Sequence, residues 1–140
     1  MLSERVIGKK AWVTGAAHGI GRASAWALAE AGADVAISDI NEKGLEETAE
    51  YIRKLGRKAL VLPADITKEN EIEETINTIV DKWGKLDIAY CNAGTFQDIP
   101  AEDMPLEEFE RVIKVNLTGA FISSRAAGKA MIKQKSGSII

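Results

Sequence analysis

The chain has 140 residues, of which 46% are hydrophobic and 28% are charged, and its formal net charge at pH 7 is −3. These values are ordinary for one globular domain with a sizeable core, so we expect a single domain over residues 1–140. The slight acidic excess and the scattered basic residues exclude a nucleic-acid partner and an anionic membrane surface. No apolar stretch approaches the length that crosses a bilayer.

Cys91 is the only cysteine of the chain. An internal disulfide needs two cysteines, so the sequence excludes a fold stapled by disulfides within the chain. A lone cysteine is typical of proteins that work in a reducing compartment, and we therefore predict a cytoplasmic location.

Short apolar segments alternate with longer amphipathic ones along the chain. The pattern predicts four strands, at residues 11–13, 34–39, 58–63 and 86–91. Helices are expected between them, from 19 to 31, over the residues before Gly56, and from Thr67, the expected cap, to Trp83. Each of these helices ends next to a glycine, which is the common residue at a helix C-terminus.

The rest of the chain is predicted to hold one long helix and the beginning of a further strand. Pro105 suits the first turn of a helix that continues to Lys133, and residues 138–140 resemble the first half of a fifth strand. Repeated strand–helix units of this length form parallel sheets with right-handed crossovers and helices on both faces. The predicted fold class is therefore α/β, a doubly wound parallel sheet in a three-layer α/β/α arrangement, truncated in the fifth strand.

A glycine-rich segment, T-G-A-A-H-G-I-G, lies between the first predicted strand and the first predicted helix. Glycine at the strand end permits a tight turn, and glycines nearer the helix let the backbone approach a pyrophosphate. The helix N-terminus then offers N–H groups and a partial positive charge to that anion. Glycines also mark ordinary turns, but this position favours cofactor binding by Thr14, Gly15, His18, Gly19, Ile20 and Gly21.

His18 is the only histidine of the chain. A lone histidine in a loop is more often solvated or packed than a ligand, and no cysteine or carboxylate cluster lies near it in the sequence. We therefore predict no metal site, and we expect His18 to lie near the phosphates or the ribose of a bound nucleotide.

Asp39 closes the second predicted strand, about 20 residues after the glycine turn. A carboxylate at this position accepts both hydroxyl groups of an adenosine ribose and repels a 2′-phosphate. A site for NADP would need Arg or Lys just after the strand, but Ile40 and Asn41 follow here. The pattern therefore predicts NAD in preference to NADP. The alternative interpretation is that Asp39 caps the next helix.

Together, these features resemble the short-chain dehydrogenase/reductase family along the whole chain. The segment 14–21 is similar to the cofactor loop of that family, and Asp39 is similar to its NAD-selecting acid. The resemblance implies a Rossmann-type sheet and an NAD-dependent oxidoreductase, and it implies that the protein assembles as a dimer or tetramer.

Two further motifs carry the resemblance. Asp65 and Ile66 follow the third predicted strand and are similar to the pair that holds the adenine ring. Asn92, Ala93 and Gly94 end the fourth predicted strand and match the N-A-G element that steadies the sheet beside the cofactor. Alone, Asp65 could cap the next helix and Asn92 could be a turn residue, but the order and spacing of the motifs favour the family.

Asn116 matches the asparagine midway along the long helix, which in the family loosens that helix and holds a water in a proton relay. The alternative is an ordinary exposed helix residue. The other catalytic positions of the family are a Ser and a Y-x-x-x-K pair. Here Tyr51 is followed four positions later by Leu55, and Tyr90 by Gly94. We therefore expect a truncated nucleotide-binding part that is inactive alone.

Residues 86–94 and 100–105 are most similar to family members that act on sugars, polyols or small secondary alcohols. The resemblance thus implies a small alcohol or ketone substrate for the full-length form. Two alternatives remain open: a non-catalytic module that binds NAD or AMP, and an interaction fragment that pairs through its long helix. Without the helix that packs beside it in the family, Leu117, Phe121 and Met131 should be partly exposed.

Overall fold

Five parallel strands form one sheet in the order β3-β2-β1-β4-β5. In the computed structural model, which describes residues 5–140, the strands are β1 Lys10–Thr14, β2 Asp34–Ser38, β3 Ala59–Val61, β4 Ile88–Tyr90 and β5 Ser138–Ile139. The order reverses between β1 and β4, because the chain crosses from β3 at one edge back to the far side of β1. A reversal of this kind creates a crevice at the carboxyl ends of the central strands.

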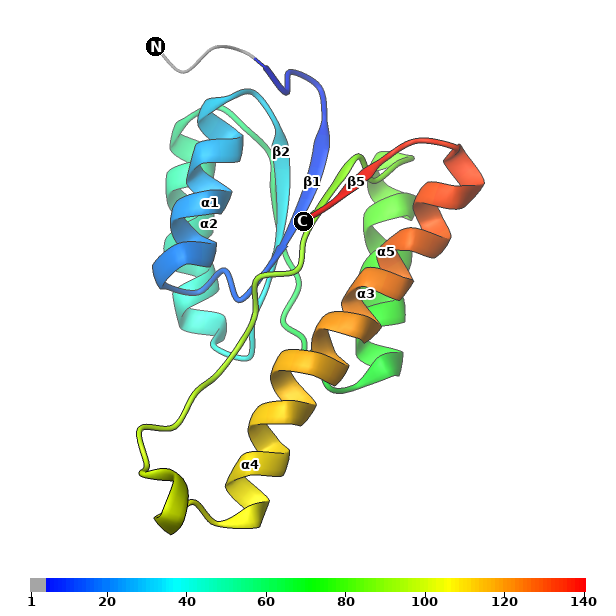
Figure 1. Cartoon of the computed structure of the whole chain (residues 1–140). Coiled ribbons are helices and arrows are strands. Elements are labelled where there is room, and N and C mark those ends of the chain that lie inside the picture. The colour runs from blue at the N-terminus through cyan, green and yellow to red at the C-terminus, as the bar shows by residue number, and fades with distance from the viewer. Residues whose placement is uncertain (1–4) are drawn as a thin grey trace.

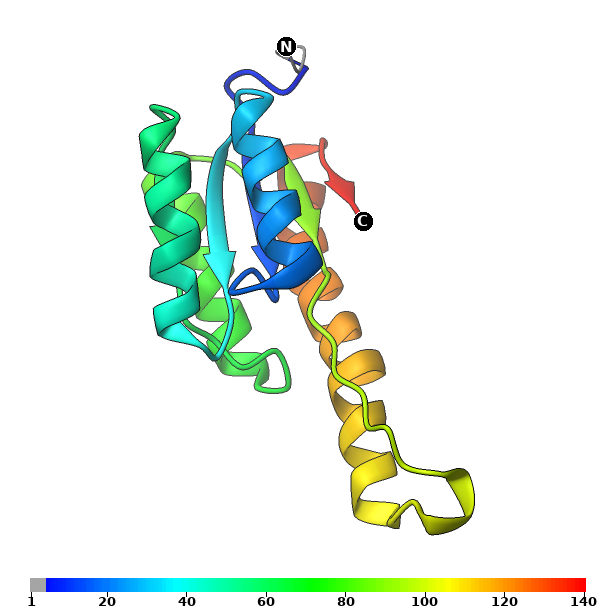
Figure 2. The ribbon, with the colours of Figure 1, turned by 90° about the vertical axis from the view of Figure 1, so that its left-hand side faces the viewer.

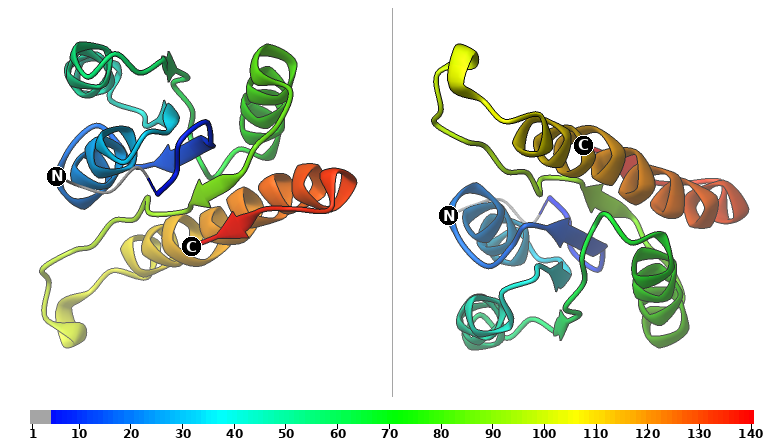
Figure 3. Two further views of the ribbon diagram at one scale, coloured as in Figure 1. Left: turned by 90° about the horizontal axis from the view of Figure 1, so that it is seen from above. Right: turned by 90° about the horizontal axis from the view of Figure 1, so that it is seen from below.

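Helices cover both faces of the sheet, as the views along the layers show (Figure 3). One face carries α1 (Gly19–Glu30) and α2 (Glu42–Lys54), and the other carries α3 (Glu69–Trp83) and α5 (Ala120–Gln134). The predicted three-layer, doubly wound Rossmann-type fold is confirmed (Figure 1).

An arm extends beyond the carboxyl edge of the sheet (Figure 2). It consists of the loop after β4, the short 3-10 helix η1 (Ala101–Asp103) and helix α4 (Leu106–Ile113). The predicted long helix is therefore not uniform, since the π-helical segment η2 (Lys114–Gly119) separates α4 from α5. The residues between Pro105 and Lys133 still form one continuous rod.

Some boundaries differ from the prediction. β2 ends at Ser38, so Asp39 lies in the connection beyond the strand, and β3 and β4 have only three residues each. Thr67 was expected to cap α3, which was wrong, because Lys68 is the N-cap residue. The Thr67 hydroxyl instead donates to Asp65, which forms a local turn before the helix.

The core has two layers, one on each face of the sheet. Ala11 and Val13 of β1 pack toward α1 and α2, whereas Trp12 packs toward α3 and α5, as the alternation of a strand requires. Trp12 is fully buried, and its indole N–H donates to Ser38 Oγ at 2.9 Å. Helix α1 approaches the sheet closely because it buries small residues, namely Gly21, Ala25 and Ala29.

Two aspartates at the amino edge of the sheet are held by basic side chains. Asp34 accepts from Lys10 Nζ at 2.6 Å and from Arg57 at 2.9 Å. Burial alone would raise the pKa of Asp34, but its bond with Lys10 and the other donors lower it below its usual value. Asp87 accepts from the Lys10 amide at 2.8 Å and pairs with Lys85 at 3.0 Å, and its pKa is lowered in the same way against burial.

The outer side of the long rod is apolar. Leu117 is 65% exposed and Phe121 is 58% exposed, as predicted. The prediction for Met131 was wrong, since its side chain is buried in the core layer between the sheet and α3, against the turn at Gly137. Within residues 5–140, no helix combines the length and apolar character that a membrane crossing requires.

Candidate cofactor-binding site

A cleft of about 1000 Å³ opens at the carboxyl edge of the sheet, where the strand order reverses. The cleft brings together the glycine turn, the ends of β2, β3 and β4, and segment η2. The predicted site residues that line it are Gly15, His18, Gly19, Ile20, Gly21, Asp39, Ile40, Asp65, Ile66, Asn92, Ala93, Gly94 and Asn116. Thr14, the remaining predicted residue, lies buried beneath the turn.

The glycine turn packs directly against the end of β4. Gly15 has φ +66°, and a Cβ there would lie 2.8 Å from the Ala93 Cα. A Cβ on Gly21 would overlap the Gly15 carbonyl oxygen and lie 2.6 Å from Asn92 Nδ2. Side chains at these two positions would therefore separate α1 from the turn and from β4, which explains the glycine spacing in physical terms.

Hydrogen bonds fix the end of β4 to the turn. Asn92 Nδ2 donates to the Thr14 carbonyl at 3.1 Å, and the Ala93 amide donates to Thr14 Oγ1 at 3.0 Å. Thr14 thus shapes the floor of the cleft from below. The N-A-G element is held in register with β1 by these bonds.

Helix α1 begins at Gly19 and points its N-terminus into the cleft lining. His18 is the N-cap residue, with extended backbone, and its exposed side chain makes no capping bond. The first N–H groups of a helix have no partner within it, so this end suits the pyrophosphate of a dinucleotide. The residues present therefore fit a nucleotide cofactor.

The outer side of the turn is held by two residues that the sequence motifs did not reveal. Arg22 donates to Thr48 Oγ1 at 3.1 Å and also to the carbonyl of Ala17. The Thr48 hydroxyl donates to the Ala16 carbonyl at 2.8 Å and is fully buried. These bonds tie the turn to α2. No spacing in the sequence signals the Arg22–Thr48 bond, because its partners are 26 residues apart.

Asp39 lies beside the turn. Its carboxylate accepts from the Ala17 amide at 3.1 Å and from the Asn41 amide at 3.0 Å. Asn41 is the residue whose side chain caps α2, by accepting from the Gly44 amide at 3.0 Å. Asp39 therefore orders the turn and the connection before α2, and both of its oxygens retain acceptor capacity toward the cleft.

Asp65 and Ile66 line another part of the cleft. Asp65 Oδ1 accepts from the Thr67 amide at 2.9 Å and from the Thr67 hydroxyl at 2.7 Å. Burial alone would raise the pKa of Asp65, but these two bonds and the charges of Lys68 and Lys114 lower it, so the carboxylate is ionised at neutral pH. Ile66 packs on η2, where a Cβ on Gly119 would lie 2.5 Å from its Cδ1.

Asn116 lies in the π-helical segment η2. Its Oδ1 accepts from the Thr95 amide at 2.7 Å, and its Nδ2 donates to the Thr95 carbonyl at 2.8 Å. The side chain thus anchors the loop after Gly94 to the rod. The wider turn of a π-helix is frequent at functional sites, and here it coincides with the asparagine that the sequence singled out.

Two basic residues, Arg111 of the arm and Lys114 of η2, also line the cleft, and the sequence motifs did not reveal them. Arg111 donates to Glu108 at 3.1 Å and to Thr95 Oγ1 at 3.3 Å, so its charge is partly engaged. Lys114 is exposed near Asp65. Both lie within about one turn of Asn116 on the rod, which is the only signal that could have found them.

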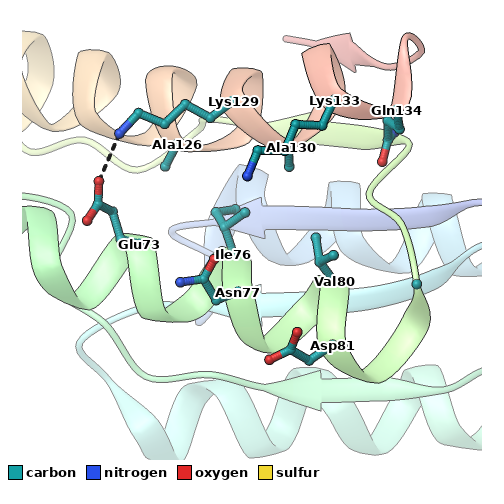
Figure 4. Close-up of a pocket in the computed structure, with 11 residues that line it drawn as sticks. Glu73, Ile76, Asn77, Val80, Asp81, Ala126, Lys129, Ala130, Lys133 and Gln134 are labelled. Carbon is teal, nitrogen blue, oxygen red and sulfur yellow. Dashed lines mark hydrogen bonds and ion pairs between the residues drawn. The ribbon is translucent and has the colours of Figure 1, made fainter.

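A second hollow, of about 490 Å³, lies between α3 and α5 (Figure 4). The Glu73–Lys129 ion pair spans it at 3.0 Å, and both helices contribute apolar side chains to its lining, namely Ile76, Val80, Ala126 and Ala130. None of the predicted cofactor residues lines it. Among residues 5–140, no three His, Cys, Asp or Glu side chains gather as metal ligands would.

The family model described as short chain dehydrogenase matches residues 9–140, so the chain belongs to this family. It is 43% identical over 136 residues to a short-chain dehydrogenase/reductase of Armillaria gallica, which covers 95% of this chain and 52% of that protein. The chain therefore spans about half the length of the relatives it matches.

Two solved structures are closely similar. A short-chain type dehydrogenase/reductase from Mycobacterium marinum has a TM-score of 0.94 and 39% identity, over 97% of this chain and 56% of that one. NAD+-bound xylitol dehydrogenase has a TM-score of 0.93 and 37% identity, over 96% of this chain and 52% of that one. The family is one of oxidoreductases with a nicotinamide cofactor.

Proposed function

We propose that the cleft binds NAD in preference to NADP and serves an NAD-dependent short-chain oxidoreductase. The observation that carries the proposal is Asp39, whose carboxylate lies in the same cleft as the glycine turn with acceptor capacity left over. The α1 N-terminus would take the pyrophosphate, Asp39 the ribose hydroxyls, and Asp65 with Ile66 the adenine ring. Ile40 would cover the outer side of the ribose, since it is exposed at the cleft.

The preference for NAD has an electrostatic reason. A 2′-phosphate would bring its negative charge beside Asp39, and two unit charges about 4 Å apart repel by about 4 kcal/mol at an effective dielectric constant of about 20. Ile40 and Asn41, which follow Asp39, offer no compensating positive charge. The basic residues that line the cleft, Arg111 and Lys114, come from the arm and η2 rather than from the end of β2.

The reaction we propose for the whole protein is hydride transfer between NAD and a small alcohol, polyol, sugar or ketone. Similarity to NAD+-bound xylitol dehydrogenase supports this substrate class. When bound, NAD supplies the hydride acceptor. The chain's own residues bind and orient the dinucleotide, and Asn116 holds the loop after Gly94 beside it.

Neither tyrosine of this chain suits the proton transfer that the reaction needs. The Tyr51 hydroxyl donates to Glu30 at 2.8 Å on the α1–α2 face, away from the cleft lining, and this bond raises the pKa of Tyr51. Tyr90 is packed against the core layer under α1 and α2. A phenol acts as a base at neutral pH only when its pKa is lowered, so we propose that the 140 residues bind NAD without turning it over.

The alternative function is a non-catalytic NAD or AMP module, which the same adenosine site supports. The exposed apolar face at Leu117 and Phe121 supports a homo-oligomer.

We also propose a cytoplasmic location. There the half-buried Cys91 thiol, whose pKa is raised by burial, stays reduced.

Calorimetric titration of the 140-residue chain with NAD, NADP and AMP tests the proposal. We expect NAD to bind at least about tenfold more tightly than NADP, because of the charge of Asp39. AMP should bind more weakly than NAD but measurably, since it carries the adenosine half of the dinucleotide. Equal affinities for NAD and NADP would contradict the preference, and no binding of any of the three would contradict the site itself.

A further inference from the structure

Helix α2 lies directly behind the glycine turn and fits it closely. A Cβ on Gly44 would lie 2.7 Å from the Ala17 carbonyl oxygen and 2.8 Å from the Ala17 Cβ. Alanine is otherwise the better helix former, so glycine in the first turn of α2 serves this close approach. The fully buried Thr48 lies one turn further along the same helix.

All backbone polar groups of Ala16 and Ala17, which lie inside the turn, have partners. Their amides donate to groups at the end of β2 and just after it, at 3.2 and 3.1 Å. Their carbonyls accept from the opposite side, the first from the Thr48 hydroxyl at 2.8 Å and the second from the Arg22 guanidinium. Both peptide planes are therefore fixed, and with them the direction in which the chain enters α1.

Arg22 also decides which carbonyl the Thr48 hydroxyl serves. This hydroxyl has one proton and two acceptors within reach, the Ala16 carbonyl at 2.8 Å and the Gly44 carbonyl at 2.9 Å. Arg22 Nη2 donates to the Gly44 carbonyl at 3.2 Å, and Arg22 Nε donates to the Thr48 oxygen at 3.1 Å. Because the Gly44 carbonyl already accepts from Arg22, the single proton of Thr48 is left for the turn.

We infer that Arg22 and Thr48 are positioning residues that hold the turn in the shape that takes a pyrophosphate. The inference rests on the proposed function and adds to it two residues that do not line the cleft. The anion would meet the N-terminus of α1, which follows the turn directly. A turn that is already held in this shape loses little conformational entropy on binding, so the bonds behind it favour the ligand in front of it.

Thr48→Val tests the inference without changing any charge. Valine has nearly the shape of threonine, but it leaves the Ala16 carbonyl without its donor. The probes are ADP, which carries a pyrophosphate, and adenosine, which carries none, and NMR titration of the chain measures the affinity for each. We expect ADP to bind about tenfold more weakly than in the wild type and adenosine to stay within about twofold, because only ADP uses the turn.

Two further variants separate position from charge. Thr48→Ser keeps the hydroxyl group and should restore the wild-type affinity for ADP. Arg22→Lys keeps the positive charge, but a single ammonium group cannot reproduce the planar fork that reaches several acceptors of the turn and α2. It should therefore lose ADP affinity as Thr48→Val does. Full ADP affinity in Arg22→Lys would mean that the charge alone acts, which would overturn the inference.

Thermal unfolding of the four proteins checks that each is folded at the titration temperature. Equal losses of ADP and adenosine affinity in Thr48→Val would indicate a general structural role, and an unchanged ADP affinity would mean that the turn keeps its shape without the bond. Either result overturns the inference and leaves the proposed function intact. A wild-type chain that binds neither ADP nor adenosine would refute the proposed function and this inference together.

Discussion

Each edge of the sheet holds a pair of aspartates, and the two pairs are bonded in opposite ways. At the amino edge, Asp34 and Asp87 accept from lysine and arginine side chains at 2.6–3.0 Å. At the carboxyl edge, Asp39 and Asp65 accept only from amide and hydroxyl groups of neighbouring residues. The four side chains share one chemistry, but among residues 5–140 only the second pair has no cationic side chain bonded to it.

The difference separates carboxylates that serve the fold from those that are open to a ligand. A buried carboxylate that already pairs with cations gains little from a further donor, and its removal leaves those cations uncompensated. A carboxylate held by neutral donors is oriented but not neutralised, so it remains a strong acceptor for the hydroxyl or amine of a ligand. Only Asp39 and Asp65 of the four line the cleft.

The most severe way to break the carboxyl edge is Gly21→Ala. The new Cβ would overlap the Gly15 carbonyl oxygen, so α1 must move away from the turn. We expect a loss of about 3 kcal/mol in the free energy of unfolding, typical of overpacking, and no measurable NAD binding. Chemical denaturation and calorimetry measure the two effects.

Gly128→Ala is the matched control, because Gly128 is also helical but its Cβ would meet only Ile139 Cδ1, at 3.8 Å. This variant should be as stable as the wild type or more stable by up to about 1 kcal/mol, with unchanged NAD affinity. If Gly21→Ala behaved like Gly128→Ala, the close packing of turn, helix and β4 would not matter for the site.

Breaking the amino edge should change stability rather than binding. Asp34→Asn removes the charge that compensates Lys10 and Arg57. The Nε atom of Arg57 is already buried without a partner among residues 5–140. We expect the free energy of unfolding to fall by about 2 to 3 kcal/mol, at the low end for a buried pair because both cations are partly exposed. Urea denaturation at neutral pH measures this change.

The same variant has a signature in its pH dependence. The pKa of Asp34 is lowered in the folded state. The ionised carboxylate therefore contributes fully to the free energy of unfolding above its unfolded pKa, near ~3.9, and this contribution is lost as the pH falls through the lower folded pKa. The free energy of unfolding of the wild type should therefore decrease as the pH falls below about 4, and this decrease should be less steep in Asp34→Asn. The same decrease in both proteins would mean that Asp34 has the same pKa in the folded and the unfolded state.

Much of this arrangement is predictable from local patterns. The alternation of short apolar segments with longer amphipathic ones, and the glycines after the helices, predicted the layers, because repeated strand–helix units place helices on both faces of a parallel sheet. The turn at 14–21 and Asp39 were both predicted to bind the cofactor, and the structure joins them through the Ala17 amide.

What was missed depends on contacts between distant segments. Arg22 and Thr48 hold the turn from 26 residues apart, and no local pattern encodes such a pair. Thr67 looks like a helix cap in sequence, and only the position of Asp65 in space shows that its hydroxyl is used elsewhere. Met131 was expected to be partly exposed, for lack of the helix that packs there in the family, but it is buried against the turn at Gly137, which local helical periodicity does not describe.

NAD affinity and the thermal midpoint of unfolding in Asp39→Asn and Asp87→Asn show whether the two edges of the sheet divide ligand binding and stability between them. Asp39→Asn should weaken NAD binding by about tenfold, which is what the loss of a charge-assisted hydrogen bond costs, and should shift the thermal midpoint by less than about 2 °C. Asp87→Asn should lower the midpoint by several degrees and leave NAD affinity within about twofold. Equal losses of NAD affinity in the two variants, or none in Asp39→Asn, would mean that the two edges do not divide these roles.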